Sequence, residues 1–262
     1  MSRFCTLSSS SRGNSVFLSG GATTLLIDCG VSYRRLRVML HELGADAAAL
    51  RGIVVTHEHS DHISGLKTLL KQLNIPVYGS EKTLRYLCAN DIVPISGSVI
   101  PIDSATAIGE LEVLPFDTPH DAVHSIGMRV LMPDGRRVGI ATDLGHITSA
   151  VQTHLTGCDL VYIESNYDPG MLFCSHYPYQ IKQRINGSHG HLSNADCASE
   201  LSRLVSCGST RFVLGHLSEQ NNLPQLAAQT ARAALAEKNM RENIDYVLTV
   251  ARAREPIPVV VF

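Results

Sequence analysis

Three histidines and one aspartate stand within six positions of one another, directly after an apolar stretch. Residues 56–62 read Thr-His-Glu-His-Ser-Asp-His and follow the apolar residues 53–55. A buried strand that ends this way is typical of a metal-binding loop at a sheet edge, because imidazole and carboxylate groups ligate zinc or iron. A polar surface turn is the simpler alternative, but a turn gives no reason for three histidines and an aspartate to occur together directly after a strand. The stretch predicts a metal site formed by His57, His59, Asp61 and His62.

Composition limits the classes of protein to which the chain can belong. Its 262 residues are 44% hydrophobic, enough for one large domain or two small ones. A net charge of −2 gives no overall attraction to nucleic acid or an anionic membrane, so a polyanion would need a local patch or bound metal. The seven cysteines include no Cys-x-x-Cys pair, and no apolar run resembles a signal peptide or a membrane span. We expect a soluble, cytoplasmic protein with reduced thiols and no membrane partner.

Helical and strand patterns alternate along the chain. Apolar spacings of three and four predict helices at residues 32–43, 65–73, 81–89, 147–155, 179–186, 194–205 and 223–239. Short apolar runs predict strands at 4–7, 16–18, 23–28, 53–55, 76–78, 98–102, 111–116, 127–132, 137–142, 160–164, 211–214, 246–250 and 259–262. There is no linker or low-complexity segment. The sequence therefore predicts one domain, residues 1–262, with a layered α/β architecture.

Three later strands also end in candidate ligands. The strand at 111–116 runs into His120, the strand at 137–142 into Asp143, and the strand at 211–214 into His216. Loops at one edge of a sheet converge, so these residues can join the first four in one cluster. Five histidines and two carboxylates exceed the needs of one tetrahedral metal. They fit two metals about 3.5–4 Å apart that share a carboxylate.

The pattern of the first loop, followed by the three later ligands, resembles that of the metallo-β-lactamase-fold hydrolases across essentially the whole chain. The resemblance implies a four-layer αββα sandwich with its site along one edge of the paired sheets. It also implies two divalent metal ions, for which Zn²⁺ is favoured and Mn²⁺ or Fe²⁺ are alternatives. The implied ligands are His57, His59 and His120 for one ion, Asp61, His62 and His216 for the other, and Asp143 as a bridge. The best-known class of zinc β-lactamases has cysteine where Asp143 stands, which argues against antibiotic hydrolysis.

Several local stretches are more specifically similar to the YycJ (WalJ) family, with ribonuclease Z as a more distant relative. They are residues 7–14, 119–122, 164–166, 184–194 and 215–222. Members of this family are regarded as metal-dependent nucleases, and 5′-to-3′ exonuclease activity on DNA is proposed for them. Ser10 stands where that family usually has glycine, which puts the shape of the first loop in question. The resemblance implies nucleic acid as partner, with DNA favoured over RNA and a small phosphodiester as the alternative.

Two residues are candidates for direct roles in the chemistry. By resemblance to ribonuclease Z, His191 helps to protonate the leaving group; the alternative is a solvent-facing histidine beside the helix cap Ser193. We favour catalysis, because a phosphodiester leaving oxygen needs a proton donor of suitable pKa. Asp61 would orient or deprotonate the attacking water.

Five polar residues are candidates for binding the substrate: Ser9, Ser11, Asn14, Ser218 and Asn222. The first three can bind phosphate oxygens, or they can serve only to form a tight turn. Ser218 and Asn222 follow His216 closely in the chain, and capping of the following helix is their alternative role. His124 is a further alternative as a ligand or a substrate contact.

The sequence favours a dinuclear metal-dependent phosphodiesterase, and specifically a 5′-to-3′ exonuclease on DNA ends. Two metals would lower the pKa of a water from 15.7 to about 7, and the resulting hydroxide would attack phosphorus. One alternative is a small-molecule hydrolase of cyclic phosphodiesters or thioesters. Another is a non-catalytic regulatory or scaffold protein, against which the complete ligand set argues. Nothing in the sequence indicates an oligomeric state.

Overall fold

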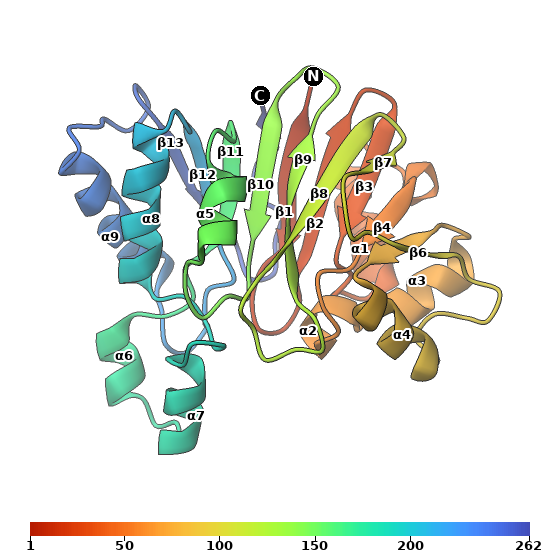
Figure 1. Cartoon of the computed structure of the whole chain (residues 1–262), viewed down its shortest axis with the longest axis horizontal. Coiled ribbons are helices and arrows are strands. Elements are labelled where there is room, and N and C mark those ends of the chain that lie inside the picture. Colours follow the sequence, from red (N-terminus) through yellow and green to blue (C-terminus); the bar gives the residue numbers. More distant parts are fainter.

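Two seven-stranded sheets lie face to face in the computed structural model, which describes residues 1–262 (Figure 1). The first sheet has the order β14-β1-β2-β3-β4-β5-β6. Its strands are β1 (Arg3–Ser8), β2 (Ser15–Gly20), β3 (Thr23–Ile27), β4 (Gly52–Val54), β5 (Val77–Gly79), β6 (Val99–Pro101) and β14 (Val260–Val261). The strands from β3 to β6 run parallel, whereas β14, β1, β2 and β3 are antiparallel neighbours.

The second sheet has the order β13-β12-β11-β10-β9-β8-β7. Its strands are β7 (Thr106–Ile108), β8 (Leu111–Asp117), β9 (Ile126–Leu131), β10 (Arg137–Ala141), β11 (Leu160–Glu164), β12 (Arg211–Gly215) and β13 (Val247–Val250). Here β7 to β10 are antiparallel and β10 to β13 parallel. Both sheets are therefore mixed.

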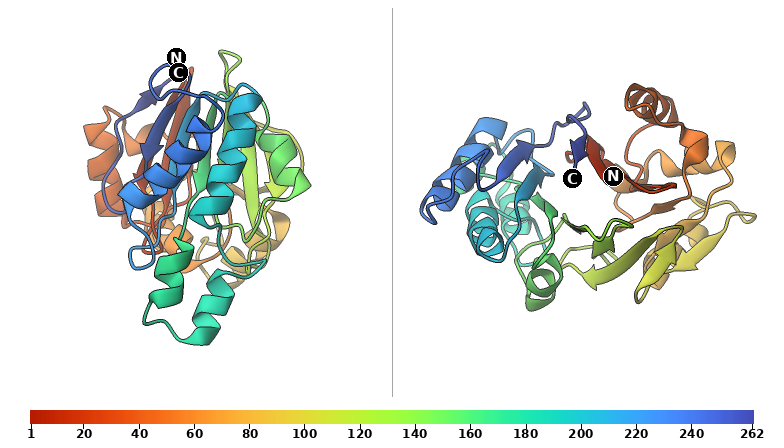
Figure 2. Two further views of the ribbon diagram at one scale, coloured as in Figure 1. Left: turned by 90° about the vertical axis from the view of Figure 1, so that its left-hand side faces the viewer. Right: turned by 90° about the horizontal axis from the view of Figure 1, so that it is seen from above.

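Helices cover the outer face of each sheet. The first sheet carries α1 (Tyr33–Glu42), α3 (Leu66–Gln72) and α4 (Glu81–Ala89), and the second carries α5 (Ser149–Leu155), α8 (Asn194–Ser206) and α9 (Pro224–Ala236) (Figure 2). The short helices η1 (Ala47–Ala49), α2 (Ser60–Ile63), α6 (Pro169–Cys174) and α7 (Tyr179–Ile185) complete the structure. These layers confirm the predicted αββα sandwich.

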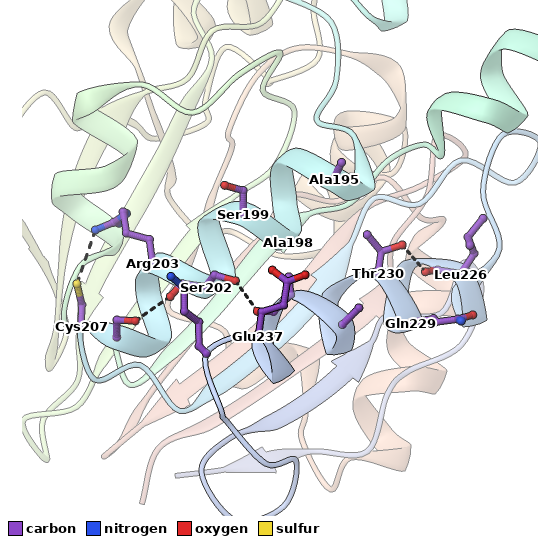
Figure 3. A pocket seen from close by; sticks show the side chains of 14 residues that line it. Ala195, Ala198, Ser199, Ser202, Arg203, Cys207, Leu226, Gln229, Thr230 and Glu237 are labelled. Carbon is purple, nitrogen blue, oxygen red and sulfur yellow. Dashed lines mark hydrogen bonds between the residues drawn. The ribbon is translucent and has the colours of Figure 1, made fainter.

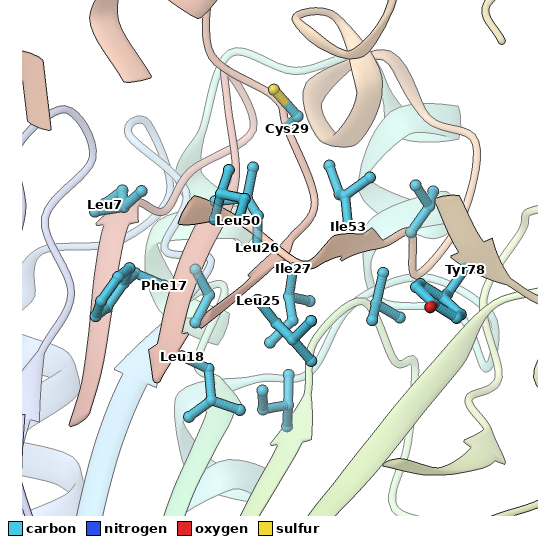
Figure 4. Close-up of a cluster of buried hydrophobic side chains, with 14 of the residues drawn as sticks. Leu7, Phe17, Leu18, Leu25, Leu26, Ile27, Cys29, Leu50, Ile53 and Tyr78 are labelled. Carbon is cyan, nitrogen blue, oxygen red and sulfur yellow. The ribbon is translucent and has the colours of Figure 1, made fainter. Parts of the chain in front are cut away.

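The main hydrophobic core fills the space between the sheets and continues under the helices of the first sheet. It joins 42 buried residues, among them Phe17, Leu18 and Leu25 of the first sheet (Figure 4). The rings of Phe4 on β1 and Tyr162 on β11 approach across the sandwich, with centroids 5.7 Å apart. Central strands read as continuous apolar runs because both faces of each sheet are covered.

The predicted elements agree with the structure except at four short ones. Residues 60–63 form the single turn α2 where a loop was expected, and η1, β7 and α6 were not predicted. The segment before α6 looks like a turn, because Asp168 is followed by Pro169 and a glycine. In the structure Asp168 caps α6 through its hydrogen bond from the Met171 amide (2.8 Å), and Pro169 occupies the first turn.

Two expectations drawn from composition can be compared with the structure. All seven cysteines are free: four are buried, and Cys88, Cys174 and Cys207 are exposed. None of the helices combines the length and hydrophobicity needed to cross a bilayer.

Candidate metal centre

The seven predicted ligands converge at one edge of the sandwich, the lower edge in Figure 1 where α2 lies. The first sheet supplies the four residues of the opening loop, which follow β4 and continue into α2. The second sheet supplies three: His120 after β8, Asp143 after β10 and His216 after β12. The loops between strands and helices therefore bring together residues that are up to 159 positions apart in the chain.

Their donor atoms form two groups joined by Asp143. The nitrogens of His57, His59 and His120 lie within 4.8 Å of one another, and so do the donor atoms of Asp61, His62 and His216. Asp143 lies between the groups, with Oδ1 3.8 Å from His120 Nε2 and Oδ2 3.3 Å from His62 Nε2. The arrangement has the form of two metal positions that share one carboxylate.

Four of the five histidines have Nδ1 held by an outer partner, so that Nε2 faces the centre. The pairs are His57 with Thr56 Oγ1 (3.0 Å), His62 with Asp28 Oδ2 (2.8 Å), His120 with the Gly190 carbonyl (3.0 Å) and His216 with Glu164 Oε1 (3.0 Å). In the fifth, His59, Nδ1 faces the centre, 3.2 Å from His120 Nε2. Such outer contacts fix the tautomer and the ring orientation of metal-binding histidines.

Two donor atoms of the cluster are buried without a hydrogen bond, namely His57 Nε2 and Asp143 Oδ2. A buried polar atom left without a partner costs about 1–3 kcal/mol. The close approach of Asp143 Oδ2 to His62 Nε2 is not a hydrogen bond by geometry. A cation would satisfy both atoms, so the residues present fit the two metal ions that the sequence predicts.

The electrostatics of the cluster also suit cations. Burial, followed by the charge of His62, lowers the pKa of His57 well below its ordinary value, which leaves a neutral imidazole with a free lone pair. Burial opposes protonation of His216 too, but the carboxylates of Asp143, Asp61 and Glu164 together outweigh it and raise the pKa of His216 to about 10. Burial likewise opposes ionisation of Asp61 and Asp143, yet the surrounding histidines lower the pKa of both. Both carboxylates are therefore ionised at neutral pH.

Three residues at strand ends adopt the left-handed backbone conformation: Asp28 (φ 59°), Asp143 (φ 57°) and His216 (φ 52°). Asp, Asn and His are the types other than glycine most often found there, because their short polar side chains bond locally. Such strained positions cost about 1–3 kcal/mol each and persist where the surroundings fix them. Here the sharp turn directs each side chain into the cluster.

Glu164, which is fully buried, connects two histidines. Its Oε1 lies 2.7 Å from His191 Nδ1 and 3.0 Å from His216 Nδ1, while Oε2 accepts the amides of Leu144 and Leu192. The His191 side chain is 15% exposed, and its Nε2 has no hydrogen-bond partner within the protein. The structure thus places His191 beside the centre with one nitrogen fixed and the other free.

Asp28 and Glu164 were not predicted as site residues. Each nevertheless stands at the end of a strand, as the predicted ligands do, and this is the signal that could have identified them. Glu164 also belongs to a stretch that resembles the YycJ family, but its contact with His191 requires the three-dimensional structure.

The predicted substrate-binding residues occupy different environments. Ser9 is buried, with its hydroxyl 2.7 Å from Tyr162 Oη and accepting the His216 amide at 2.7 Å. Asn222 is buried and donates to the carbonyls of Ser165 and Asn166. Because their polar groups are already bonded within the protein, these contacts favour a role in positioning the loops over a substrate contact.

The other three predicted contacts lie nearer the surface or the ligands. Ser218 accepts the Asn221 amide at 3.1 Å within a turn, and it does not cap the following helix α9, whose cap residue is Leu223. Asn14 is buried with Nδ2 3.0 Å from both Asp61 Oδ2 and His62 Nε2, so it orients ligands. Only Ser11, which is exposed, has a hydroxyl free to reach a bound molecule.

His124 lies outside the donor groups. Its Nε2 lies at hydrogen-bond distance, 2.9 Å, from Asp117 Oδ1, and its side chain is one-third exposed. The structure does not place it among the ligands of either position.

A separate groove of about 990 Å³ runs between α8 and α9 and contains no member of the cluster (Figure 3). Its walls are largely alanine and serine, and Ser202 there donates to the Ala234 carbonyl at 3.0 Å. This groove is the seam between two packed helices. The chemistry of the donor set, rather than the size of a groove, identifies the candidate site.

Comparison with known proteins agrees with this geometry. A family model described as "Beta-lactamase superfamily domain" matches residues 23–217. The chain is 31% identical to the exodeoxyribonuclease YycJ of Bacillus anthracis over 239 residues, 90% of this chain and 89% of that protein. It is 30% identical to the exodeoxyribonuclease WalJ of Streptococcus pneumoniae over 248 residues, 93% and 92% of the two chains.

Two more distant proteins extend the comparison. A ribonuclease Z of Streptomyces avermitilis is 25% identical over 302 residues, covering 94% of this chain and 92% of that protein. The structure of the metallo-β-lactamase fold protein YhfI from Bacillus subtilis superposes with a TM-score of 0.72 at 15% identity, covering 98% and 99% of the chains. The last likeness shows the fold alone. The chain therefore belongs to the metallo-β-lactamase superfamily of metal-dependent hydrolases, in the family of the exodeoxyribonucleases YycJ and WalJ.

Proposed function

We propose that residues 1–262 form one hydrolase domain that cleaves phosphodiesters with two divalent metal ions and acts as a 5′-to-3′ exonuclease on DNA ends. The observation that carries this proposal is the paired donor set around Asp143, with His191 fixed beside it by Glu164. The relatives named exodeoxyribonucleases, which align over nearly their whole length, support the choice of DNA.

The metal ligands are assigned as three for each ion and one shared. His57, His59 and His120 would hold one ion, Asp61, His62 and His216 the other, and Asp143 both. Divalent ions bound there supply Lewis acidity, which stabilises charge on phosphoryl oxygens and acidifies water. Zinc is our choice for both positions, since its usual ligands are imidazole and carboxylate groups; manganese and iron suit them as well.

Two side chains of the protein would accept and donate the protons of the reaction. The Asp61 side chain is 19% exposed, more than those of Asp143, His62 and His216, so it can orient an incoming water and accept its proton. The water oxygen forms the new bond to phosphorus, and the bond from phosphorus to the leaving oxygen breaks. His191 donates the proton from Nε2 to that oxygen, while Glu164 stabilises the imidazolium through Nδ1.

The proposed setting is the cytoplasm. Free cysteines throughout the chain support a reducing compartment, since disulfides form mainly in oxidising ones.

The test replaces single ligands and follows defined DNA ends. His59→Ala and Asp143→Ala should each abolish cleavage of a 5′-phosphorylated oligonucleotide, because each variant removes a donor that the two-metal chemistry requires. His41→Ala, an exposed histidine on α1, is the matched control and should retain full activity. Circular dichroism should show an unchanged fold, and elemental analysis should show less bound metal in the two ligand variants.

Labels at opposite ends of the oligonucleotide test the polarity. Stepwise loss from the 5′ end supports the proposal, whereas loss from the 3′ end or internal cuts would contradict it. Parallel assays with bis-p-nitrophenyl phosphate, a cyclic phosphodiester and a glutathione thioester test the small-molecule alternative. Full DNA cleavage by either ligand variant would overturn the assignment of the centre.

A further inference from the structure

The helices α6 and α7 project from the body of the protein at the edge that holds the metal centre. Both views of the fold show this pair extending beyond the two sheets (Figures 1 and 2). Its interior is small, since only Tyr167, Leu172 and Ile185 form a buried cluster there, with Tyr177 packed against them. The pair is therefore supported by few apolar contacts, and most of its surface faces solvent.

The exposed surface of this pair is aromatic and free of acidic groups. The Phe173 side chain is 81% exposed and Tyr179 is 71% exposed, on a chain with few aromatic residues. Residues 169–195 contain Lys182, Arg184 and three histidines but no aspartate or glutamate. Exposed aromatic rings beside basic groups form the surface that single-stranded nucleic acids bind, because bases stack on the rings and phosphates pair with the cations.

A groove of about 670 Å³ lies between the two helices. Phe173 and Tyr179 line it together with Lys182, and the amide side chains of Gln183 and Asn186 contribute polar groups. Lys182 is held at the groove by its hydrogen bond to the Phe173 carbonyl (2.7 Å). The lining thus combines ring faces, a cation, and donors and acceptors suited to a base edge.

The end of α7 is linked to the metal centre by hydrogen bonds. The Ile185 carbonyl accepts the His191 amide at 2.9 Å, and the Gly190 carbonyl lies 3.0 Å from His120 Nδ1. Arg184 is paired with Asp121, the residue after that ligand, at 2.5 Å. The segment after α7 therefore borders the centre, and α7 is one of the elements that a strand leaving the active site can pass.

We propose that the groove between α6 and α7 binds a nucleobase of single-stranded substrate, stacked on Phe173 and Tyr179, with its phosphate beside Lys182. This inference rests on the proposed nuclease function and adds the place where the strand is held outside the metal centre. It also explains how a chain with a net charge of −2 binds a polyanion, because the attraction is local.

The test compares substrates that do and do not reach the groove. Phe173→Ala with Tyr179→Ala should raise KM for a single-stranded oligonucleotide roughly tenfold or more, since loss of stacking weakens binding at each base. Turnover of bis-p-nitrophenyl phosphate should stay within about twofold of the wild type, because this substrate is too small to reach from the metal centre to the groove. Tyr86→Ala, an exposed tyrosine on α4 across the molecule, is the matched control and should change neither.

Direct binding tests the groove independently of cleavage. Fluorescence anisotropy with a phosphorothioate single strand should show the same loss of affinity in the double variant. Lys182→Ala should reduce the slope of log affinity against log salt by about 0.7, the value for one phosphate of a single strand. Melting temperatures close to the wild type would establish that each variant is folded.

The outcomes separate this proposal from the proposed function. Equal binding by the wild type and the double variant overturns the groove and leaves the nuclease assignment standing. A wild type that binds the single strand through these residues but cleaves no nucleic acid supports the groove and overturns the function. If the wild type binds no oligonucleotide, the proposed strand-binding role of the groove is wrong. It is also wrong if light scattering shows that the wild type is a dimer and that the double substitution dissociates it.

Discussion

At the scale of single residues, Glu164 has a role that few side chains can fill. Its two oxygens accept from four donors, which are the ring nitrogens of His191 and His216 and the amides of Leu144 and Leu192. Burial raises its pKa, but the interactions with His191 and His216 together outweigh that effect and lower the pKa, so the carboxylate stays ionised. One group thus holds a presumed metal ligand and a presumed proton donor in a fixed relation.

Glu164→Gln should lower phosphodiester cleavage about 10- to 100-fold, because an amide offers one accepting oxygen where two are needed. The amide NH₂ would face either two ring N–H groups or two backbone N–H groups. Steady-state kinetics and elemental analysis together measure the loss of activity and of bound metal.

Glu200→Gln is the matched control for this substitution. Glu200 is also buried, and it pairs with Arg203 at 2.6 Å on α8, outside the centre. It should lower stability without changing turnover. Wild-type activity in Glu164→Gln would show that the carboxylate does not position His191.

The sequence reveals site residues only where they are grouped or follow a strand. His57, His59, Asp61 and His62 form a local pattern that is visible in the sequence alone, and their role as metal ligands stays a prediction. For Ser9 the sequence left a phosphate contact and a turn residue as alternatives, because burial of a hydroxyl depends on the residue across the sandwich, here Tyr162, which no local pattern contains. Long-range partners are what the sequence could not supply.

At the scale of elements, the centre depends on close contact between the loop after β3 and the helix α2. A Cβ added at Gly30 would lie 1.6 Å from the Asp61 carbonyl oxygen and 2.5 Å from the Asn14 amide nitrogen. The Asp61 carbonyl itself accepts the Asn14 amide at 2.7 Å. The ligand loop and the serine-rich loop are therefore fitted together by backbone atoms that cannot move aside cheaply.

Gly30→Ala should destabilise the fold by about 3 kcal/mol or more and reduce metal binding, because the clash is with backbone rather than a flexible side chain. Gly135→Ala is the control, since its Cβ meets nothing within 4 Å and only its φ of +83° is unfavourable. That control should cost about 1 kcal/mol. Chemical denaturation measures the free energy of unfolding of both variants. An equal loss of stability in the two would show that the close contact between Gly30 and Asp61 is not important for the fold.

Helices with standard caps were predicted better than short elements. The bounds of α4 agree with the prediction, and Ser80 caps it by accepting the Thr83 amide at 3.2 Å. The helices α2 and α6 have four and six residues, too few for a hydrophobic period to be visible. Of the two helices that form our proposed strand-binding groove, α6 was therefore not visible in the sequence, whereas α7 was predicted.

At the scale of the whole molecule, each presumed metal position takes ligands from both sheets. The first combines His57 and His59 with His120, and the second combines Asp61 and His62 with His216. Bound metals would thus join the two halves of the sandwich. Ligands that bind only the folded state stabilise it by mass action.

Removal of metal by a chelator should lower the melting temperature by about 5–10 °C. A metal present at 100 times its Kd stabilises the folded state by roughly 2.7 kcal/mol, and each kcal/mol shifts the melting temperature of a domain of this size by about 2–4 °C. Adding the metal back should restore it. Asp143→Ala, which lacks the shared carboxylate, should show little response to either treatment. A melting temperature independent of metal in the wild type would indicate that the centre does not join the sheets.

The contact between Phe4 and Tyr162 in the core has a consequence for how such a protein evolves. Tyr162 contacts Ser9, and Ser9 in turn accepts the amide of His216, so a short series of contacts leads from the middle of the sandwich to a ligand. Selection for catalysis therefore acts on an interior aromatic residue that never meets the substrate. Lineages that exchange this residue would have to change the first loop at the same time, so the two positions should vary together.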